Sequence, residues 1–143
     1  MKAFIGIDPG INGGISWIVD GDMMTSKMPD SEKGVIDLLF EIRECCDSCV
    51  ARLEQVHSMP GQGVSSSFKF GMGFGGLKMA LAAWEIPYEL VPPQKWQKHL
   101  GCLTGGNKNI TKAFAQALFP TIRVTHAIAD SMLIAEYCRR TSM

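Results

Sequence analysis

Near its start the chain reads Lys2-Ala-Phe-Ile-Gly-Ile-Asp8-Pro9-Gly10, a short apolar run that ends in a carboxylate and two chain-breaking residues. The apolar residues fit a buried strand. An ionised carboxylate is costly to bury without a partner, so we expect Asp8 at the tip of this strand, facing an open site. Asp, Pro and Gly are also good turn residues, so a simple turn is the alternative for Asp8 taken alone.

Two more strands and a helix are predicted directly after this turn. Gly13 to Val19 and Asp22 to Met28 flank Asp20-Gly21, a dipeptide that favours a tight hairpin. The first three strands should therefore form an antiparallel meander. Ser31 then supplies a helix-capping signal, and apolar residues recur at helical spacing over residues 31–46.

A second carboxylate, Glu54, lies near the end of a β-prone run from Cys49 to Val56. Because this run returns after a helix, it can pair parallel to the first strand through a right-handed crossover. Asp8 and Glu54 would then lie side by side at adjacent strand tips, which is what a divalent metal ion needs. A charge on an edge strand is the alternative for Glu54 alone.

The segment from 57 to 76 is polar at first and then rich in Phe and Gly. It leads into a plain helix predicted from Leu77 to Trp84, so we expect the segment to form a mobile flap beside the site. Each of its later glycines lowers helix propensity by about 1 kcal/mol. Close packing against another helix, including one from a second subunit, would compensate for this loss at Gly71, Gly73, Gly75 and Gly76.

The remaining chain predicts one strand and three helices. The strand is expected over residues 88–91 and is closed by two prolines. Short helices are expected over 94–98 and 111–119, with a loop rich in Gly and Asn over 101–109 between them. The last helix should begin near Thr125 and run to the paired arginines.

This last predicted helix carries two polar side chains that point the same way. His126 and Asp130 are four residues apart, so they share one helix face near its N-terminal end. Ile128, Met132 and Leu133 can face the sheet. An ordinary helix-start residue is the alternative for His126, whereas a solvated position is less natural for Asp130 among its apolar neighbours.

Length and composition predict that residues 1–143 form one domain with a sizeable core. The chain is 46% hydrophobic and 20% charged, with no run of eighteen apolar residues and no export leader, so we expect a cytoplasmic protein with no membrane contact. Five mostly bunched cysteines suit a reducing compartment. Cys46 and Cys49 form a C-x-x-C pair, but no second pair completes a zinc site.

Net charge is zero, yet it is unevenly distributed along the chain. Residues 1–86 hold seven Lys and Arg against eleven Asp and Glu, and residues 87–143 hold seven against three. The basic part is the expected contact for a polyanion, and a solvated basic face with no ligand is the alternative. The candidate phosphate contacts in this basic part of the chain are Lys95, Lys98, Lys108, Lys112, Arg139 and Arg140.

Three motifs together resemble those of the RuvC-type Holliday-junction resolvases of the ribonuclease H-like superfamily, of the small bacterial and bacteriophage kind. They are Ile5-Gly6-Ile7-Asp8-Pro9-Gly10, Leu53-Glu54-Gln55-Val56 and Ala129-Asp130-Ser131-Met132-Leu133-Ile134-Ala135. The resemblance spans almost the whole chain. It implies an α/β fold with a central five-stranded mixed sheet flanked by helices, and a homodimer. It also implies resolution of four-way DNA junctions by paired symmetric cuts that need Mg²⁺ or Mn²⁺.

The resemblance also implies roles for individual residues. Asp8, Glu54 and Asp130 match the family's metal-ligand positions. The fourth catalytic position, an acidic residue or His, often lies three residues before the last Asp, where this chain has Ala127, and His126 is the nearest candidate. Such a His can orient or deprotonate the attacking water. An aromatic ring in the flap, Phe68 or Phe70 here, would lie near the junction centre.

Three other functions compete with this interpretation. Actin-like ATPases and sugar kinases share an Ile-Asp-x-Gly start but need two such domains, and 143 residues supply one. A non-catalytic or weakly active junction-binding module would fit Ala127 and the zero net charge. A related nuclease of the same superfamily, acting on branched DNA in general or on RNA, is the third.

Overall fold

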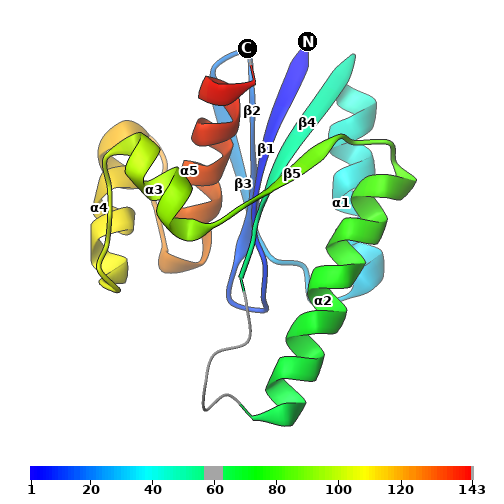
Figure 1. Cartoon of the computed structure of the whole chain (residues 1–143). Helices are drawn as coiled ribbons and strands as arrows, with labels where there is room; N and C mark the ends of the chain where they lie inside the picture. The colour runs from blue at the N-terminus through cyan, green and yellow to red at the C-terminus, as the bar shows by residue number, and fades with distance from the viewer. Residues whose placement is uncertain (57–62, 143) are drawn as a thin grey trace.

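The computed structural model describes residues 1–56 and 63–142, and within these ranges five strands form one mixed sheet (Figure 1). The strand order is β3-β2-β1-β4-β5. β1 pairs antiparallel with β2 and parallel with β4, while β3 is antiparallel to β2 and β5 is parallel to β4. The α/β fold predicted from the sequence is confirmed. The strands are β1 (Lys2–Asp8), β2 (Gly14–Val19), β3 (Asp22–Lys27), β4 (Ser48–Glu54) and β5 (Tyr88–Val91).

Helices cover both faces of this sheet. α1 (Glu32–Cys45) and α2 (Val64–Ala83) lie on one face, and α3 (Pro93–Leu100), α4 (Lys108–Leu118) and α5 (His126–Thr141) lie on the other (Figure 1). Each layer encloses its own apolar cluster, one around Leu39 and Leu81, and one around Trp96, Met132 and Leu133. None of the helices in the described ranges is both long and apolar enough to cross a membrane.

The hairpin and the first helix form for the local reasons that the sequence indicates. Asp20 and Gly21 have φ values of 51° and 84°, the left-handed conformation that a tight two-residue hairpin turn requires at both positions. Ser31 caps α1, and its side chain accepts a hydrogen bond of 3.0 Å from the backbone N–H of Gly34. Both elements agree with the prediction to within one or two residues.

α5 lies directly against the central strand because Gly6 has no side chain. A Cβ at Gly6 would collide with the backbone of Ser131 and Ala135. The side chains of Ile5 and Ile7 on β1 are fully buried, so β1 is covered on both faces. This close contact fixes the start of α5 relative to the end of β1.

The prediction for the segment before Leu77 is wrong in part, because this segment is helical from Val64 instead of forming a flap loop. The C-terminal half of α2 packs against the sheet through its buried residues Leu77, Ala80 and Leu81. Once these turns are anchored, each further residue adds a backbone hydrogen bond, so the helix extends through its glycines despite their low propensity. The first part of the expected flap, residues 57–62, lies outside the described residues.

The glycines of α2 lie on an open surface. A Cβ added at any of them would meet no described atom within 4 Å. Packing against a second helix of the described chain, which the sequence predicted as their compensation, is therefore not found at Gly71, Gly73, Gly75 and Gly76.

Candidate active site

Two carboxylates meet at the C-terminal ends of β1 and β4. Ile7 pairs with Leu53 across these parallel strands, so the next residues, Asp8 and Glu54, are neighbours at the same edge of the sheet. The two side chains are close enough to act on each other, and the charge of Glu54 raises the pKa of Asp8. Glu54 is only 6% exposed, and Asp8 is half-buried. The adjacency predicted from the crossover is present.

Asp130 brings a third carboxylate to this pair from the opposite element. It lies in the first turns of α5, which packs across β1. Its charge acts on both Asp8 and Glu54. Thr111 of α4 lies near the Asp130 carboxylate and lowers its pKa, and the charge of Lys108 acts on Asp8 and Asp130.

The electrostatics of this cluster favour a cation. Burial and then repulsion from Glu54 and Asp130 raise the pKa of Asp8 to about 8. Burial, partly offset by the hydrogen bond from Trp96, raises the pKa of Glu54 to about 7, and burial also raises the pKa of Asp130. The three groups therefore resist ionising together unless a positive charge joins them.

The donor set fits a hard divalent ion, because Mg²⁺ prefers carboxylate oxygens and usually keeps several waters. Within residues 1–56 and 63–142, no three His, Cys, Asp or Glu side chains already form a metal cluster. Asp8 and Glu54 lie side by side at the strand ends, with Asp130 within electrostatic reach.

The raised pKa of Asp8 predicts that the metal-free protein loses stability as the pH rises. The folded pKa lies above the ordinary value of 3.8, so its contribution is present below about pH 4 and is lost as the pH rises through about 8. With a chelator, Tm should fall between about pH 5.5 and pH 8, and Mg²⁺ should raise Tm more at the higher pH.

Asp8→Asn should weaken both trends, and Asp37→Asn, which changes an exposed carboxylate on α1, is the matched control. Thermal melts with EDTA or Mg²⁺ measure both. A Tm that is independent of pH over this range, with or without Mg²⁺, would show that the pKa of Asp8 is not raised in the folded protein.

His126 lies at the first position of α5, exposed and next to the cluster. Its charge lowers the pKa of Asp130, so the two side chains lie near each other, as their shared helix face predicts. Ala127 is half-buried, and its backbone lies against Gly14 of β2. A role for His126 in catalysis stays a prediction.

Two contacts of the cluster were not predicted from the sequence. The indole Nε1–H of Trp96 donates a hydrogen bond of 2.8 Å to Oε2 of Glu54. Thr111, which is 3% exposed, lies near Asp130 and lowers its pKa, and its hydroxyl donates a hydrogen bond of 3.2 Å to the carbonyl of Lys108. The sequence showed the Pro-Pro-Gln-Lys-Trp segment, but nothing in it indicated which side chain reaches the carboxylates.

A cleft of about 550 Å³ opens beside Asp8, between the β1–β2 turn and the N-terminal half of α2. Phe70 closes part of it, with its ring 3.6 Å from the position that a Cβ would take at Gly10 and stacked on Phe74. Phe68, by contrast, is 67% exposed. The other polar side chains that line the cleft are Asn12, Ser66, Lys69 and Lys108.

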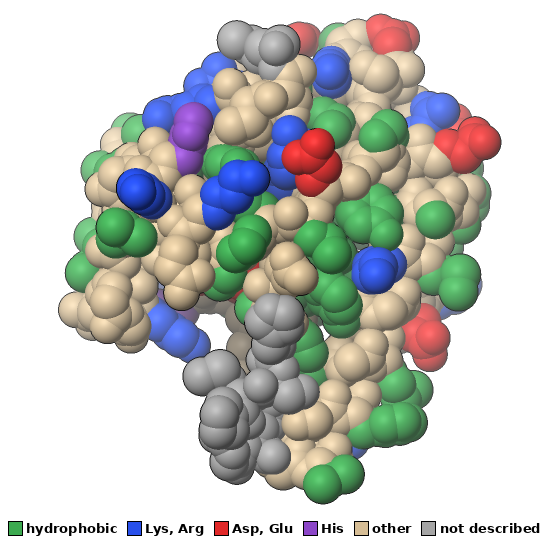
Figure 2. All heavy atoms as spheres, viewed as in Figure 1, with side chains coloured by type: hydrophobic (Ala, Val, Ile, Leu, Met, Phe, Trp, Pro, Cys, Tyr) green, Lys and Arg blue, Asp and Glu red, His purple; other side chains and the backbone are tan. Residues whose placement is uncertain are grey.

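The predicted phosphate contacts fall into two groups. Lys108 lines the cleft, Lys95 and Lys98 are exposed on α3, and Lys112 lies one turn further along α4. In Figure 2, basic side chains lie over the α3 and α4 side of the molecule, and acidic ones lie mainly over the α1 and α2 side. Lys69 of α2 also lines the cleft and was not among the predicted contacts.

The two arginines of α5 lie elsewhere. Arg139 and Arg140 are in its last turn, and a rise of about 1.5 Å per residue places Arg139 on the order of 13 Å along the axis from Asp130. Each forms an ion pair of 2.6 Å with the buried carboxylate of Glu136. The structure therefore does not bring them to the carboxylate cluster.

This arrangement of sheet and helices matches that of solved structures. Thermus thermophilus RuvC superposes with a TM-score of 0.66 at 15% identity, and its complex with a Holliday junction substrate superposes with a TM-score of 0.65 at 16% identity. In both cases 98% of this chain and 96% of the other are covered. The chain has the fold of RuvC.

A further match extends this fold outside bacteria. The yeast mitochondrial Holliday junction resolvase Ydc2 superposes with a TM-score of 0.51 at 17% identity, covering 95% of this chain and 77% of Ydc2. No protein-family model and no curated protein matches the sequence. At these identities the likeness to RuvC establishes the fold, and the activity must be argued from the site.

Proposed function

We propose that this protein is a metal-dependent endonuclease that resolves four-way DNA junctions by paired symmetric cuts. The observation that carries the proposal is the meeting of Asp8, Glu54 and Asp130 at one open edge of a RuvC fold. Basic side chains on α3 and α4 beside this edge support a nucleic-acid substrate. With Mg²⁺, the protein should cut a four-way junction and leave a linear duplex of the same sequence intact.

Asp8, Glu54 and Asp130 would hold Mg²⁺, with Mn²⁺ as a substitute. A bound ion of this kind activates water and stabilises the leaving 3′-oxygen of a phosphodiester. Lys108 attracts the scissile phosphate toward the carboxylates, since its ammonium group lines the same cleft as Asp8. His126, exposed beside Asp130, can orient the water or accept its proton near neutral pH.

The aromatic residues Phe68 and Phe70 have different places on α2, which supports different roles. The Phe70 ring packs on Phe74 and against the turn at Gly10, whereas Phe68 projects 67% exposed one half-turn earlier. An exposed ring can stack on an unpaired base for about 1–3 kcal/mol, which offsets part of the cost of opening a branch point. We assign the stacking role to Phe68.

Phe68→Ala should therefore remove most of the fluorescence change of 2-aminopurine placed at the branch point when the junction binds. Phe70→Ala is the matched control on the same helix and should retain that change, because its ring already packs within the protein. If both variants open and cut the junction normally, neither ring acts as a wedge.

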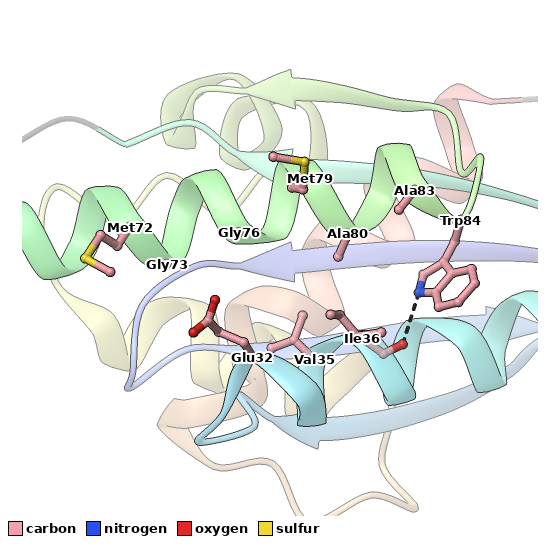
Figure 3. A pocket seen from close by; sticks show the side chains of 10 residues that line it. All are labelled: Glu32, Val35, Ile36, Met72, Gly73, Gly76, Met79, Ala80, Ala83 and Trp84. Carbon is pink, nitrogen blue, oxygen red and sulfur yellow. Dashed lines mark hydrogen bonds between the residues drawn. The ribbon is translucent and has the colours of Figure 1, made fainter.

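A homodimer is supported by an apolar groove between α1 and α2. It measures about 410 Å³ and runs from Met72 and Met79 of α2 to Ile36 and Trp84, with the open glycines Gly73 and Gly76 in its wall (Figure 3). Met72 and Met79 are 60% and 73% exposed, and α2 has no acidic residue.

We propose that a second copy of the chain covers this face. Glycines on an open helix face allow a second helix to approach closely, and exposed Met side chains adapt to many apolar shapes. Two copies would supply two carboxylate sites, one for each strand that a paired cut requires.

One observation favours a second candidate, a junction-binding module with little or no activity. Ala127 takes a position that often carries a catalytic side chain in the family that the sequence resembles. Such a module would bind four-way junctions equally well with Mg²⁺ and with EDTA, and would cut none.

A further inference from the structure

The side chain of Trp96 hydrogen-bonds Glu54, one of the proposed metal ligands. Its Nε1–H donates to Oε2 of Glu54 over 2.8 Å, and both side chains are buried, with 0% and 6% of their surface exposed. Indole is a donor only, and a buried N–H needs an acceptor. The hydrogen bond therefore fixes which way the carboxylate faces as well as where the ring lies.

The surroundings make this ring rigid. β5 pairs with β4 so that Val91 lies opposite Glu54, and Pro92 and Pro93 then start α3 immediately beyond the strand end. This short connection brings position 96 over the tip of β4. The indole packs in the apolar cluster of the α3, α4 and α5 layer, which includes Ala115 and Leu133.

We propose that Trp96 is a positioning residue that orients the Glu54 carboxylate for metal binding. The hydrogen bond occupies Oε2 and stabilises the ionised carboxylate, which would otherwise be disfavoured by burial. Some residues hydrogen-bond a metal ligand without touching the metal. Removing such a residue typically weakens metal affinity by about 10–100-fold. The inference rests on the proposed function only in taking Glu54 as a metal ligand.

The first experiment measures metal binding directly, without DNA. Trp96→Phe removes the N–H and keeps an aromatic ring, so calorimetry should show Mn²⁺ bound about 10-fold more weakly than by the wild-type protein. Trp84→Phe is the matched control, because the Trp84 indole donates to the carbonyl of Ile36 on the other face of the sheet and should leave Mn²⁺ affinity unchanged.

A second variant separates the hydrogen bond from packing. In a chain with Trp17→Phe and Trp84→Phe, position 96 is the single tryptophan and can take β-(3-benzothienyl)alanine, an isostere without the N–H. This chain should bind Mn²⁺ as weakly as Trp96→Phe while keeping the Tm of its tryptophan parent. Unchanged Mn²⁺ affinity in either position-96 variant would overturn the inference.

The wild-type protein supplies a readout that does not depend on any variant folding. Its three tryptophans give three indole ¹⁵N–H signals, and Mg²⁺ should move the Trp96 signal with the midpoint of metal binding while the Trp84 signal stays in place. A Trp96 signal that ignores saturating Mg²⁺ would also overturn the inference.

Failure of the inference and failure of the proposed function look different. A protein that binds Mg²⁺ with these signatures but cuts no junction contradicts the nuclease proposal and supports the role of Trp96. If the wild-type protein cuts junctions and Trp96→Phe binds Mn²⁺ normally, the nuclease proposal is supported and the role of Trp96 is contradicted.

Discussion

Asp8→Asn is expected to lower the rate of junction cutting by at least about 1,000-fold, or about 4 kcal/mol at 1.36 kcal/mol per factor of ten. Burial and then repulsion from Glu54 and Asp130 raise the pKa of Asp8, so a bound divalent ion would stabilise its ionised form. An amide at this position carries no charge and is a weaker ligand for Mg²⁺. Single-turnover cutting of a labelled junction measures the loss.

Binding of the junction by this variant should be unchanged or tighter, because a negative charge near the phosphate is removed. Asp37→Asn, on the exposed side of α1, is the control and should cut at the wild-type rate. Cutting by Asp8→Asn at close to that rate would remove Asp8 from the metal-binding group.

Met79→Glu is expected to convert paired cutting into slow single nicks by separating the two subunits. Met79 is 73% exposed in the single chain, so the substitution leaves the monomer's core intact, but it would bury a charge in the proposed contact. Sedimentation at micromolar concentration should show a dimer for the wild type and a monomer for the variant. A supercoiled cruciform substrate separates nicked from linear products.

Leu118→Glu supplies the matched control, since it adds the same charge to an exposed apolar position on α4, on the other side of the sheet. It should remain dimeric. If Met79→Glu also remains dimeric and still makes paired cuts, the groove between α1 and α2 is not the subunit contact. A monomeric wild-type protein would contradict the dimer altogether.

The parts of the fold that the sequence predicted well are those with local causes. The hairpin follows from Asp20-Gly21, the start of α1 from Ser31, and the pairing of Asp8 with Glu54 from two apolar runs joined by a helix. In each case a few neighbouring residues determine the backbone, and the crossover rule supplies the one long-range step.

The parts that it missed depend on contacts between distant segments. Local propensity argues against a helix through the glycines of α2, and only burial of Leu77 and Leu81 on the sheet explains it. The Trp96–Glu54 hydrogen bond joins residues 42 apart through the pairing of β5 with β4, so no spacing rule could indicate it.

The ion pairs of Glu136 could have been predicted. Arg139 and Arg140 follow it by three and four residues, the spacing that places side chains together on a helix. The excess of basic residues after residue 86 predicted that both arginines contact DNA phosphates. Their spacing from Glu136, however, already indicated an acidic partner. A DNA contact by these two residues stays a prediction, with less support than one by Lys108.

The most direct test of the nuclease proposal maps cuts on a mobile four-way junction whose four strands are end-labelled in turn. The account predicts that, with Mg²⁺, the purified protein cuts two opposing strands at symmetric positions near the branch point and leaves the matching linear duplex whole. The same mixture with EDTA should show bound but uncut junction. Full occupancy of the junction with no Mg²⁺-dependent cut in any strand would contradict the account.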